Sequence, residues 1–135
     1  INDMLDRKLN LVDSSILILG ATFKQNCPDL RNSKALEFAD YLAQLGPRVT
    51  VHDPIASIVE LKETISSLKS EARKKIHLNV LSRIDSLLKY DAIVLAVSHD
   101  SFIKYSETLA DQRFNSKIIY DLQGFLPKKL ATWRL

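Results

Sequence analysis

Hydrophobic residues in this chain alternate between short continuous runs and stripes at helical spacing. The residues at 16–19, before Gly20, and at 92–97, after Asp91, are apolar throughout. Runs of this kind are typical of strands buried on both faces of a parallel sheet. Val49 and Val51 alternate with polar residues and indicate another strand. Together these runs and two shorter ones predict strands at 14–20, 48–52, 76–80, 91–97 and 117–121.

The segments between the predicted strands carry apolar residues three or four positions apart. The clearest predicts a helix over 33–45, with either Asn32 or Ser33 as its N-cap and with Gly46 and Pro47 ending it. Its apolar stripe consists of Ala35, Phe38, Ala39, Leu42 and Leu45. The other segments predict one or two helices within 57–75, a helix over 82–89 and a helix over 100–110.

Strands that alternate with helices predict an α/β fold, a doubly wound and mostly parallel sheet sandwiched by helices, of Rossmann-like architecture. Each crossover is expected to be right-handed. Polar residues follow three of the strands, at 20–31, 98–100 and 121–123. Because the carboxyl ends of parallel strands meet at one edge, we expect the functional site there.

The composition is that of one globular domain of 135 residues, with 46% hydrophobic and 26% charged residues. The net charge of +3 is small and does not argue for nucleic acid as a partner. Glu71 lies among the basic residues at 69–75 and is spaced to pair with Lys75, so this segment is interpreted as a solvated helix face.

One cysteine, Cys27, excludes an internal disulfide and a multi-cysteine metal site and favours a cytoplasmic setting. No apolar run approaches the roughly 20 residues that span a membrane, and the first residues lack a secretory apolar region. The chain begins with Ile1, so we expect a piece of a longer protein. Residues 1–12 are predicted to be the tail of an upstream linking helix, and 13–135 the domain itself.

Dinucleotide binding is the first hypothesis for the polar edge, because Gly20 follows one strand and Asp53 ends the next. The loop after Gly20 lacks the further glycines that let a backbone approach a pyrophosphate. Asp53 also lies 33 residues after Gly20, beyond the usual spacing of about 20. We therefore interpret Asp53 as a turn residue ahead of Pro54.

Lys24 and Arg31 suggest an anion site instead. A lysine presents a point charge to a phosphate and an arginine a planar fork, and the amino end of the predicted helix adds partial positive charge. Phe23 could pack against a base or a sugar. In the alternative reading Asp29 pairs with Arg31 to fix the loop, Lys24 is solvated and Phe23 is core, and the residues alone leave the two readings open.

Cysteine and histidine are the two other residue types in this chain that could act as functional groups. Cys27 lies near a helix amino terminus and Lys24, but Pro28 and the lack of a matching histidine motif argue against a nucleophile. His52, His77 and His99 lack metal-ligand spacing and are interpreted as surface or strand-end residues, with His99 the one expected to face the site.

The motifs GATFKQNCPDLRNS, VTVHDP, DAIVLAVSHDSF and IIYDLQG occur in this order along the chain. This series resembles the carboxyl-terminal UDP-binding domain of the UDP-glucose/GDP-mannose dehydrogenase family over about 14–126. The variant NCPDLRNS is more similar to the branch that acts on UDP-N-acetylhexosamines than to the UDP-glucose branch. INDM at the start also resembles the end of the long central helix that leads into this domain.

The resemblance implies a domain that closes over a UDP-sugar in an enzyme that oxidises the C6 hydroxymethyl to a carboxylate with two NAD⁺. It implies substrate binding by Phe23 and Lys24, and an arginine, Arg31, that reaches the NAD side. Gln123 stands where the UDP-glucose enzymes carry a substrate-binding arginine. The catalytic cysteine and the NAD-binding glycine motif belong to upstream regions, so this chain alone is expected to be inactive.

The resemblance further implies a homodimer or higher homo-oligomer of the full-length enzyme. The alternative, from another class, is a stand-alone Rossmann-type regulatory, interaction or oligomerisation domain without catalysis. It would prefer a ligand unrelated to uridine, or bind a protein partner.

Overall fold

The computed structural model describes residues 11–22, 26–31, 33–69, 77–124, 126–127, 131 and 133–134. Its parallel sheet has the strand order β3-β2-β1-β4-β5-β6. The elements are β1 (Ser15–Leu19), α2 (Lys34–Gln44), β2 (Arg48–His52), α3 (Ile58–Lys69), β3 (Leu78–Val80), η1 (Leu87–Lys89), β4 (Ala92–Leu95), η2 (Asp100–Phe102), α4 (Tyr105–Leu109), η3 (Gln112–Phe114), β5 (Ile118–Asp121) and β6 (Trp133–Arg134). The doubly wound α/β fold expected from the sequence is confirmed.

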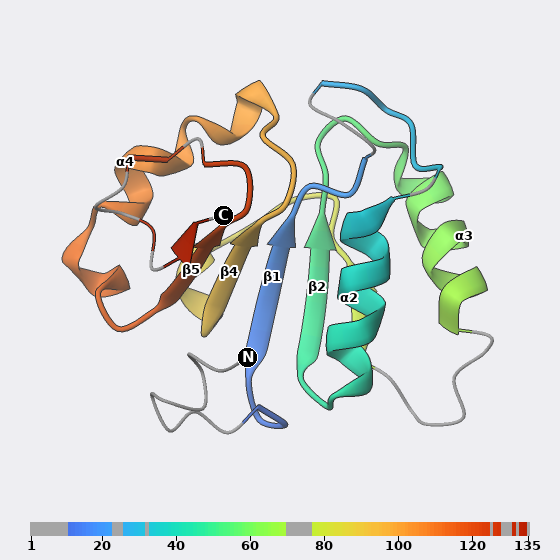
Figure 1. Ribbon diagram of the computed structural model, residues 1–135, viewed down its shortest axis with the longest axis horizontal. Coiled ribbons are helices and arrows are strands. Elements are labelled where there is room, and N and C mark those ends of the chain that lie inside the picture. The colour runs from blue at the N-terminus through green and yellow to red at the C-terminus, as the bar shows by residue number, and fades with distance from the viewer. Residues whose placement is uncertain are drawn as a thin grey trace.

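Helices cover both faces of the sheet, with α2 and α3 on one side and α4 on the other (Figure 1). Alternate residues of β1 enter the two cores: Ile16 and Ile18 pack in the cluster with α2 and α3, and Leu17 and Leu19 in the opposite cluster. All four are at most 2% exposed. Burial on both faces explains why residues 16–19 of this strand are all apolar.

Helix α2 begins where the sequence predicted. Of the two candidate caps, Ser33 is the N-cap: its Oγ accepts a hydrogen bond from Leu36 N at 3.1 Å and donates one to Ala21 O. The buried residues of the helix are Leu36, Ala39, Leu42 and Ala43. The expected stripe was wrong at its end, because Leu45 is the C-cap and 37% exposed, and it missed Leu36 and Ala43.

Three other expectations need correction. The helix predicted over 82–89 is only the turn η1, where Ser86 Oγ accepts from Leu88 N and so competes with helical bonding. The helix predicted over 100–110 is divided into η2 and α4. Strand β6 was not predicted, because its two residues are too few for a periodic signal.

The direction of winding changes at the centre of the sheet. The chain leaves β1 for α2 on one face and leaves β4 for α4 on the other, and the two strands are neighbours (Figure 1). In open α/β sheets the ligand crevice forms outside the carboxyl ends of such a pair. The loop after β1 and the residues after β4 therefore mark the candidate site.

Candidate functional site

The loop after β1 is fastened to β2 at its start. Gly20 N donates to His52 O at 2.8 Å, and Gly20 has a φ of +100°. Ala21 N and Thr22 N then donate to Asp53 Oδ2 at 2.8 and 3.3 Å. The first three residues of the loop are thus held by the end of the neighbouring strand.

Asp53 has a fully buried side chain that serves two segments. Its Oδ1 accepts from Ile55 N and Ala56 N at 2.8 and 2.9 Å, which confirms the turn role. Its Oδ2 accepts from the loop after β1 and, at 2.8 Å, from Nε2 of His99. The second role was missed from the sequence.

His99 lies beneath the loop rather than facing a ligand, so the expectation that it faces the site was wrong: the residue is 0% exposed. Its Nδ1 accepts from Asn26 N at 2.9 Å, and its Nε2 lies 2.8 Å from Asp53 Oδ2 and 3.1 Å from Thr22 Oγ1. These partners assign the neutral tautomer with the proton on Nε2.

Asn26 is held from two directions. Besides its N–H bond to His99, its Oδ1 accepts from Asp100 N at 3.1 Å. Its φ of +56° lies in the left-handed region, which asparagine tolerates better than most residues. The middle of the loop is therefore tied to the end of β4, as its start is tied to the end of β2.

Arg31 pairs with Asp29, as the alternative reading supposed. Its Nε and Nη2 donate to the carboxylate at 2.9 to 3.2 Å, and its own N–H donates to Oδ1. The hydrogen bonds from Arg31 lower the pKa of Asp29. The Arg31 side chain is 88% exposed and lines a groove of about 570 Å³ against α3. The groove residues are Pro28, Asp29, Leu30, Arg31, Glu60, Glu63 and Thr64.

Gln123 occupies the turn after β5 at the same edge. The turn is fixed by the buried Asp121, whose two oxygens accept from Gly124 N and Leu126 N at 2.8 and 2.9 Å. Gln123 Nε2 donates to Ala96 O at 3.4 Å, and Ala96 N donates to Leu19 O. Gln123 is thus connected through one residue to the end of β1.

The remaining sequence candidates divide into three groups. Phe23 and Lys24 lie outside the described residues, as do most of the basic segment at 69–75 and all but two residues of the tail at 1–12. Cys27 is partly exposed. His52 is a buried strand-end residue whose Nδ1 lies 3.0 Å from Leu81 O, and His77 is exposed.

The described residues contain no group of three His, Cys, Asp or Glu side chains placed to hold a metal ion. In the same part of the chain, no helix has both the length and the apolar character needed to cross a bilayer.

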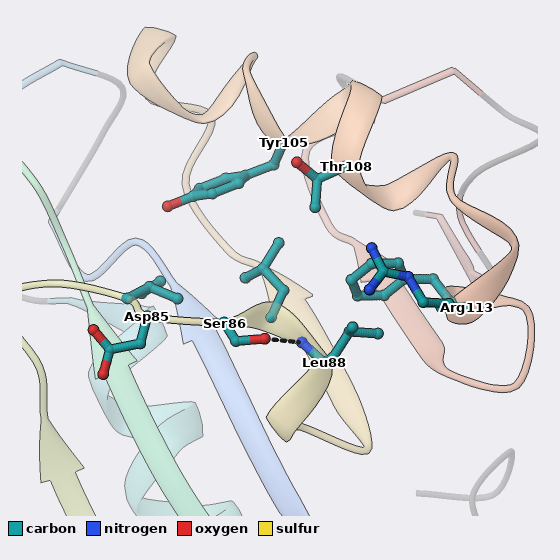
Figure 2. Close-up of a pocket in the computed structure, with 9 residues that line it drawn as sticks. Asp85, Ser86, Leu88, Tyr105, Thr108 and Arg113 are labelled. Carbon is teal, nitrogen blue, oxygen red and sulfur yellow. Dashed lines mark hydrogen bonds between the residues drawn. The ribbon is translucent and has the colours of Figure 1, made fainter.

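A second cavity, of about 290 Å³, lies on the opposite face between η1 and α4 (Figure 2). Tyr105 and Thr108 from α4 and Arg113 from η3 stand over Ser86 and Leu88. Arg113 is paired with Asp111 at 3.1 Å, and Ser86 accepts from Leu88 N. Arg113 and Ser86 thus already have partners, and the residues that line the cavity do not include the strand ends that hold the loop.

The pH dependence of stability should report on Asp53. Burial alone would raise the pKa of this carboxyl group, but hydrogen bonds from His99 and from the backbone of Ala21, Ala56 and Ile55 lower it from 3.8 to about 2. Because the folded pKa lies below the unfolded one, the stabilisation is present above about pH 4 and is lost as the pH falls toward 2. We expect a loss of about 2 kcal/mol over this window.

Urea unfolding at pH 5, 3 and 2 would measure this loss. Asp53→Asn is the control, because its side chain does not titrate there, and its stability should fall less steeply. Parallel pH profiles for the two proteins would contradict the assignment to Asp53.

The chain has clear relatives among known proteins. Residues 17–128 match the family model described as UDP-glucose/GDP-mannose dehydrogenase family, UDP binding domain. A UDP-N-acetyl-D-glucosamine 6-dehydrogenase of Salmonella typhi is 31% identical over 136 residues, which cover 100% of this chain and 29% of that protein. The enzyme of the same name from Pseudomonas aeruginosa is 30% identical over 98% of this chain and 29% of its own length. The chain therefore spans less than a third of these relatives.

Solved structures give the same fold. A UDP-glucose dehydrogenase from Pyrobaculum islandicum superposes with a TM-score of 0.65 at 22% identity, over 98% of this chain and 27% of that one. A GDP-mannose dehydrogenase from Pseudomonas aeruginosa gives a TM-score of 0.64 at 22% identity, over 92% and 27% of the two chains.

Proposed function

Because this chain belongs to the UDP-glucose/GDP-mannose dehydrogenase family and matches its UDP-binding domain over residues 17–128, we propose that it is the carboxyl-terminal UDP-sugar-binding domain of a nucleotide-sugar 6-dehydrogenase. The full-length enzyme would oxidise the C6 hydroxymethyl of a UDP-hexose or UDP-N-acetylhexosamine to a carboxylate with two NAD⁺. The names of the Salmonella and Pseudomonas relatives favour a UDP-N-acetylhexosamine as substrate.

One observation carries the proposal: two polar loops meet at the carboxyl edge of the sheet. The loop after β1 is anchored by Asp53 and His99, and the turn after β5 reaches Ala96 through Gln123. The two segments flank β4 at the point where the winding of the sheet changes direction, which is where open α/β sheets bind nucleotides. The match to the UDP-binding domain of the family supports a uridine nucleotide as the ligand at this edge.

We assign the substrate contacts to Phe23, Lys24 and Gln123. The ammonium group of Lys24 would neutralise diphosphate charge, and Phe23 would pack against the base or the sugar. Gln123 would offer an amide where the UDP-glucose enzymes carry a cation, so it would hydrogen bond the sugar without adding charge. Arg31, exposed beyond the loop, would reach the cofactor side when the full-length enzyme closes.

NAD would bind mainly to an upstream domain of that longer enzyme. In this chain the position of a ribose-binding acid is taken by Asp53, whose buried carboxylate is already used by the loop, the turn and His99. That arrangement does not fit a dinucleotide pocket, and we assign no catalytic residue to this chain. The pure chain would not oxidise a UDP-sugar, and the full-length enzyme would act as a cytoplasmic homodimer or higher homo-oligomer without nucleic acid or membrane as partner.

Titration of the ¹⁵N-labelled chain with UDP tests the proposal. UDP should shift resonances around the loop after β1 and the ends of β4 and β5, whereas AMP should not. Lys24→Ala should weaken the affinity about tenfold, the value expected for one lost charge-assisted hydrogen bond. Lys89→Ala removes the same charge beside the opposite end of β4 and should leave the affinity unchanged.

Equal effects of the two lysine variants, or equal shifts with AMP, would contradict a uridine nucleotide site at this edge. A stand-alone regulatory or interaction domain would instead respond to a ligand unrelated to uridine. A stable dimer of the chain in sedimentation, without any response to UDP, would favour an oligomerisation role.

A further inference from the structure

One imidazole holds both sides of the segment that carries the proposed substrate residues. Thr22 Oγ1 lies 3.1 Å from Nε2 of His99, and Asn26 N donates to Nδ1 at 2.9 Å. Residues 23–25 lie between these two contacts in the sequence. The residues on either side of this stretch, Thr22 and Asn26, are therefore both in contact with one rigid ring.

The ring is itself fixed on its other sides. Nε2 donates to the fully buried Asp53 carboxylate at 2.8 Å, and the ring packs at a tilt against Phe102 with centroids 5.5 Å apart. His99 N also donates to Val97 O, two residues after the end of β4. The anchor therefore belongs to the core of the sheet and is not part of the loop that it holds.

The two contacts require opposite properties from one side chain. Asn26 N–H needs a ring nitrogen with a free lone pair, whereas the Asp53 carboxylate needs a donor. Neutral histidine with the proton on Nε2 supplies an acceptor and a donor at opposite ends of a flat ring. The contact also holds Asn26 at its left-handed φ of +56°, a conformation that needs support from its surroundings.

We propose that His99 is a positioning residue for nucleotide binding: by accepting a hydrogen bond from Asn26 N it holds this end of the loop after β1 in the arrangement that binds the ligand. The inference rests on the proposed function, because the ligand is the uridine diphosphate proposed for this loop. His99 itself does not touch the ligand.

Two substitutions separate the two contacts of the ring. The amide oxygen of His99→Asn can take the place of Nδ1 and accept from Asn26, whereas the amide nitrogen of His99→Gln can take the place of Nε2 and donate to Asp53. Both variants lose one buried hydrogen bond. His52→Asn is the matched control. His52 is also a buried histidine at the end of a strand, but its Nδ1 contacts Leu81 O and not the loop after β1.

Three quantities would be measured for each variant of the whole chain: the urea midpoint, the affinity for UDP and the hydrogen exchange rate of the Asn26 amide. We expect His99→Gln to weaken UDP binding roughly tenfold and to speed Asn26 exchange by a similar factor, the loss expected for one buried hydrogen bond. His99→Asn should keep both quantities within about threefold of the wild type. His52→Asn should lower the urea midpoint but leave the UDP affinity and the Asn26 exchange rate unchanged.

Equal UDP affinities in His99→Gln and His52→Asn, or no rescue by His99→Asn, would overturn the proposal. If the wild type fails to bind UDP at millimolar concentration, the proposed function fails for this chain. The Asn26 exchange rates then decide whether His99 positions the loop, since faster exchange in His99→Gln alone supports that role and equal rates in all variants refute it.

Discussion

Replacing Asp53 with alanine is expected to lower the free energy of unfolding by about 4 kcal/mol. The carboxylate accepts hydrogen bonds from the backbone of two residues of the β1 loop, from two residues of its own turn and from His99. Its removal leaves several buried donors without an acceptor, and an unpaired buried donor costs about 1 to 3 kcal/mol. Some of these donors can reach water after the loop relaxes, so their costs should not add in full.

Urea denaturation followed by circular dichroism would measure this loss, with Asp111→Ala as the matched control. Asp111 also accepts from the backbone and pairs with an arginine, but both partners are exposed, so its removal should change the midpoint far less. Asp53→Asn should lie between the two, because an amide retains one acceptor oxygen. A midpoint for Asp53→Ala equal to that of Asp111→Ala would show that the carboxylate does not hold the strand ends together.

The parts of the fold that could be predicted from sequence are those where one physical pattern dominates. β1 and β4 are buried on both faces, so their apolar runs identify them, and the ends of β2 match the prediction residue for residue. Helix α2 combines an apolar stripe with a serine cap and a glycine stop. The strand order could then be expected from the rules for doubly wound sheets.

The failures occur where local hydrogen bonds compete with periodicity. Apolar residues at helical spacing in 82–89 predicted a helix, but the Ser86 side chain caps a single turn and Leu87 is drawn into the core. The buried face of α2 includes Leu36 and Ala43 but not Leu45, and the bond from Ser33 to Ala21 O links the start of this helix to the loop after β1. A contact between segments 12 residues apart in the sequence cannot be inferred from the spacing within one of them.

The polar edge was found from the sequence, but the way in which it is held together was not. Asp53 and His99 are 46 residues apart and show no motif spacing. A signal was nevertheless present: each residue comes at or just after the end of a strand that neighbours β1, namely β2 and β4. Polar residues at the ends of adjacent parallel strands should therefore be considered as partners before either is assigned to a ligand.

Replacing Gly20 with alanine is also expected to cost about 4 kcal/mol, for a different reason. At φ +100° an L side chain is strained, and a Cβ there would lie 2.6 Å from Val97 Cβ and 2.7 Å from Val97 N. Val97 N donates to Leu19 O, so the backbone next to Gly20 cannot retreat without opening β1 from β4. Both strands would have to shift at the point where the anchored loop begins.

Gly46→Ala separates the cost of the backbone conformation from the cost of the clash. Gly46 has a similar φ of +114°, but its added Cβ would approach only the Val12 side chain closely, at 3.0 Å, with Val12 Cα at an ordinary contact distance of 3.5 Å. An exposed side chain can move, so this variant should lose only about 1 to 2 kcal/mol, the cost of the backbone conformation. Urea midpoints of the two variants would give the difference, which we attribute to the close packing of β1 against β4. Equal losses would mean that the sheet opens easily at Gly20, and the loop after β1 would then not be held as rigidly as its hydrogen bonds to Asp53 and His99 indicate.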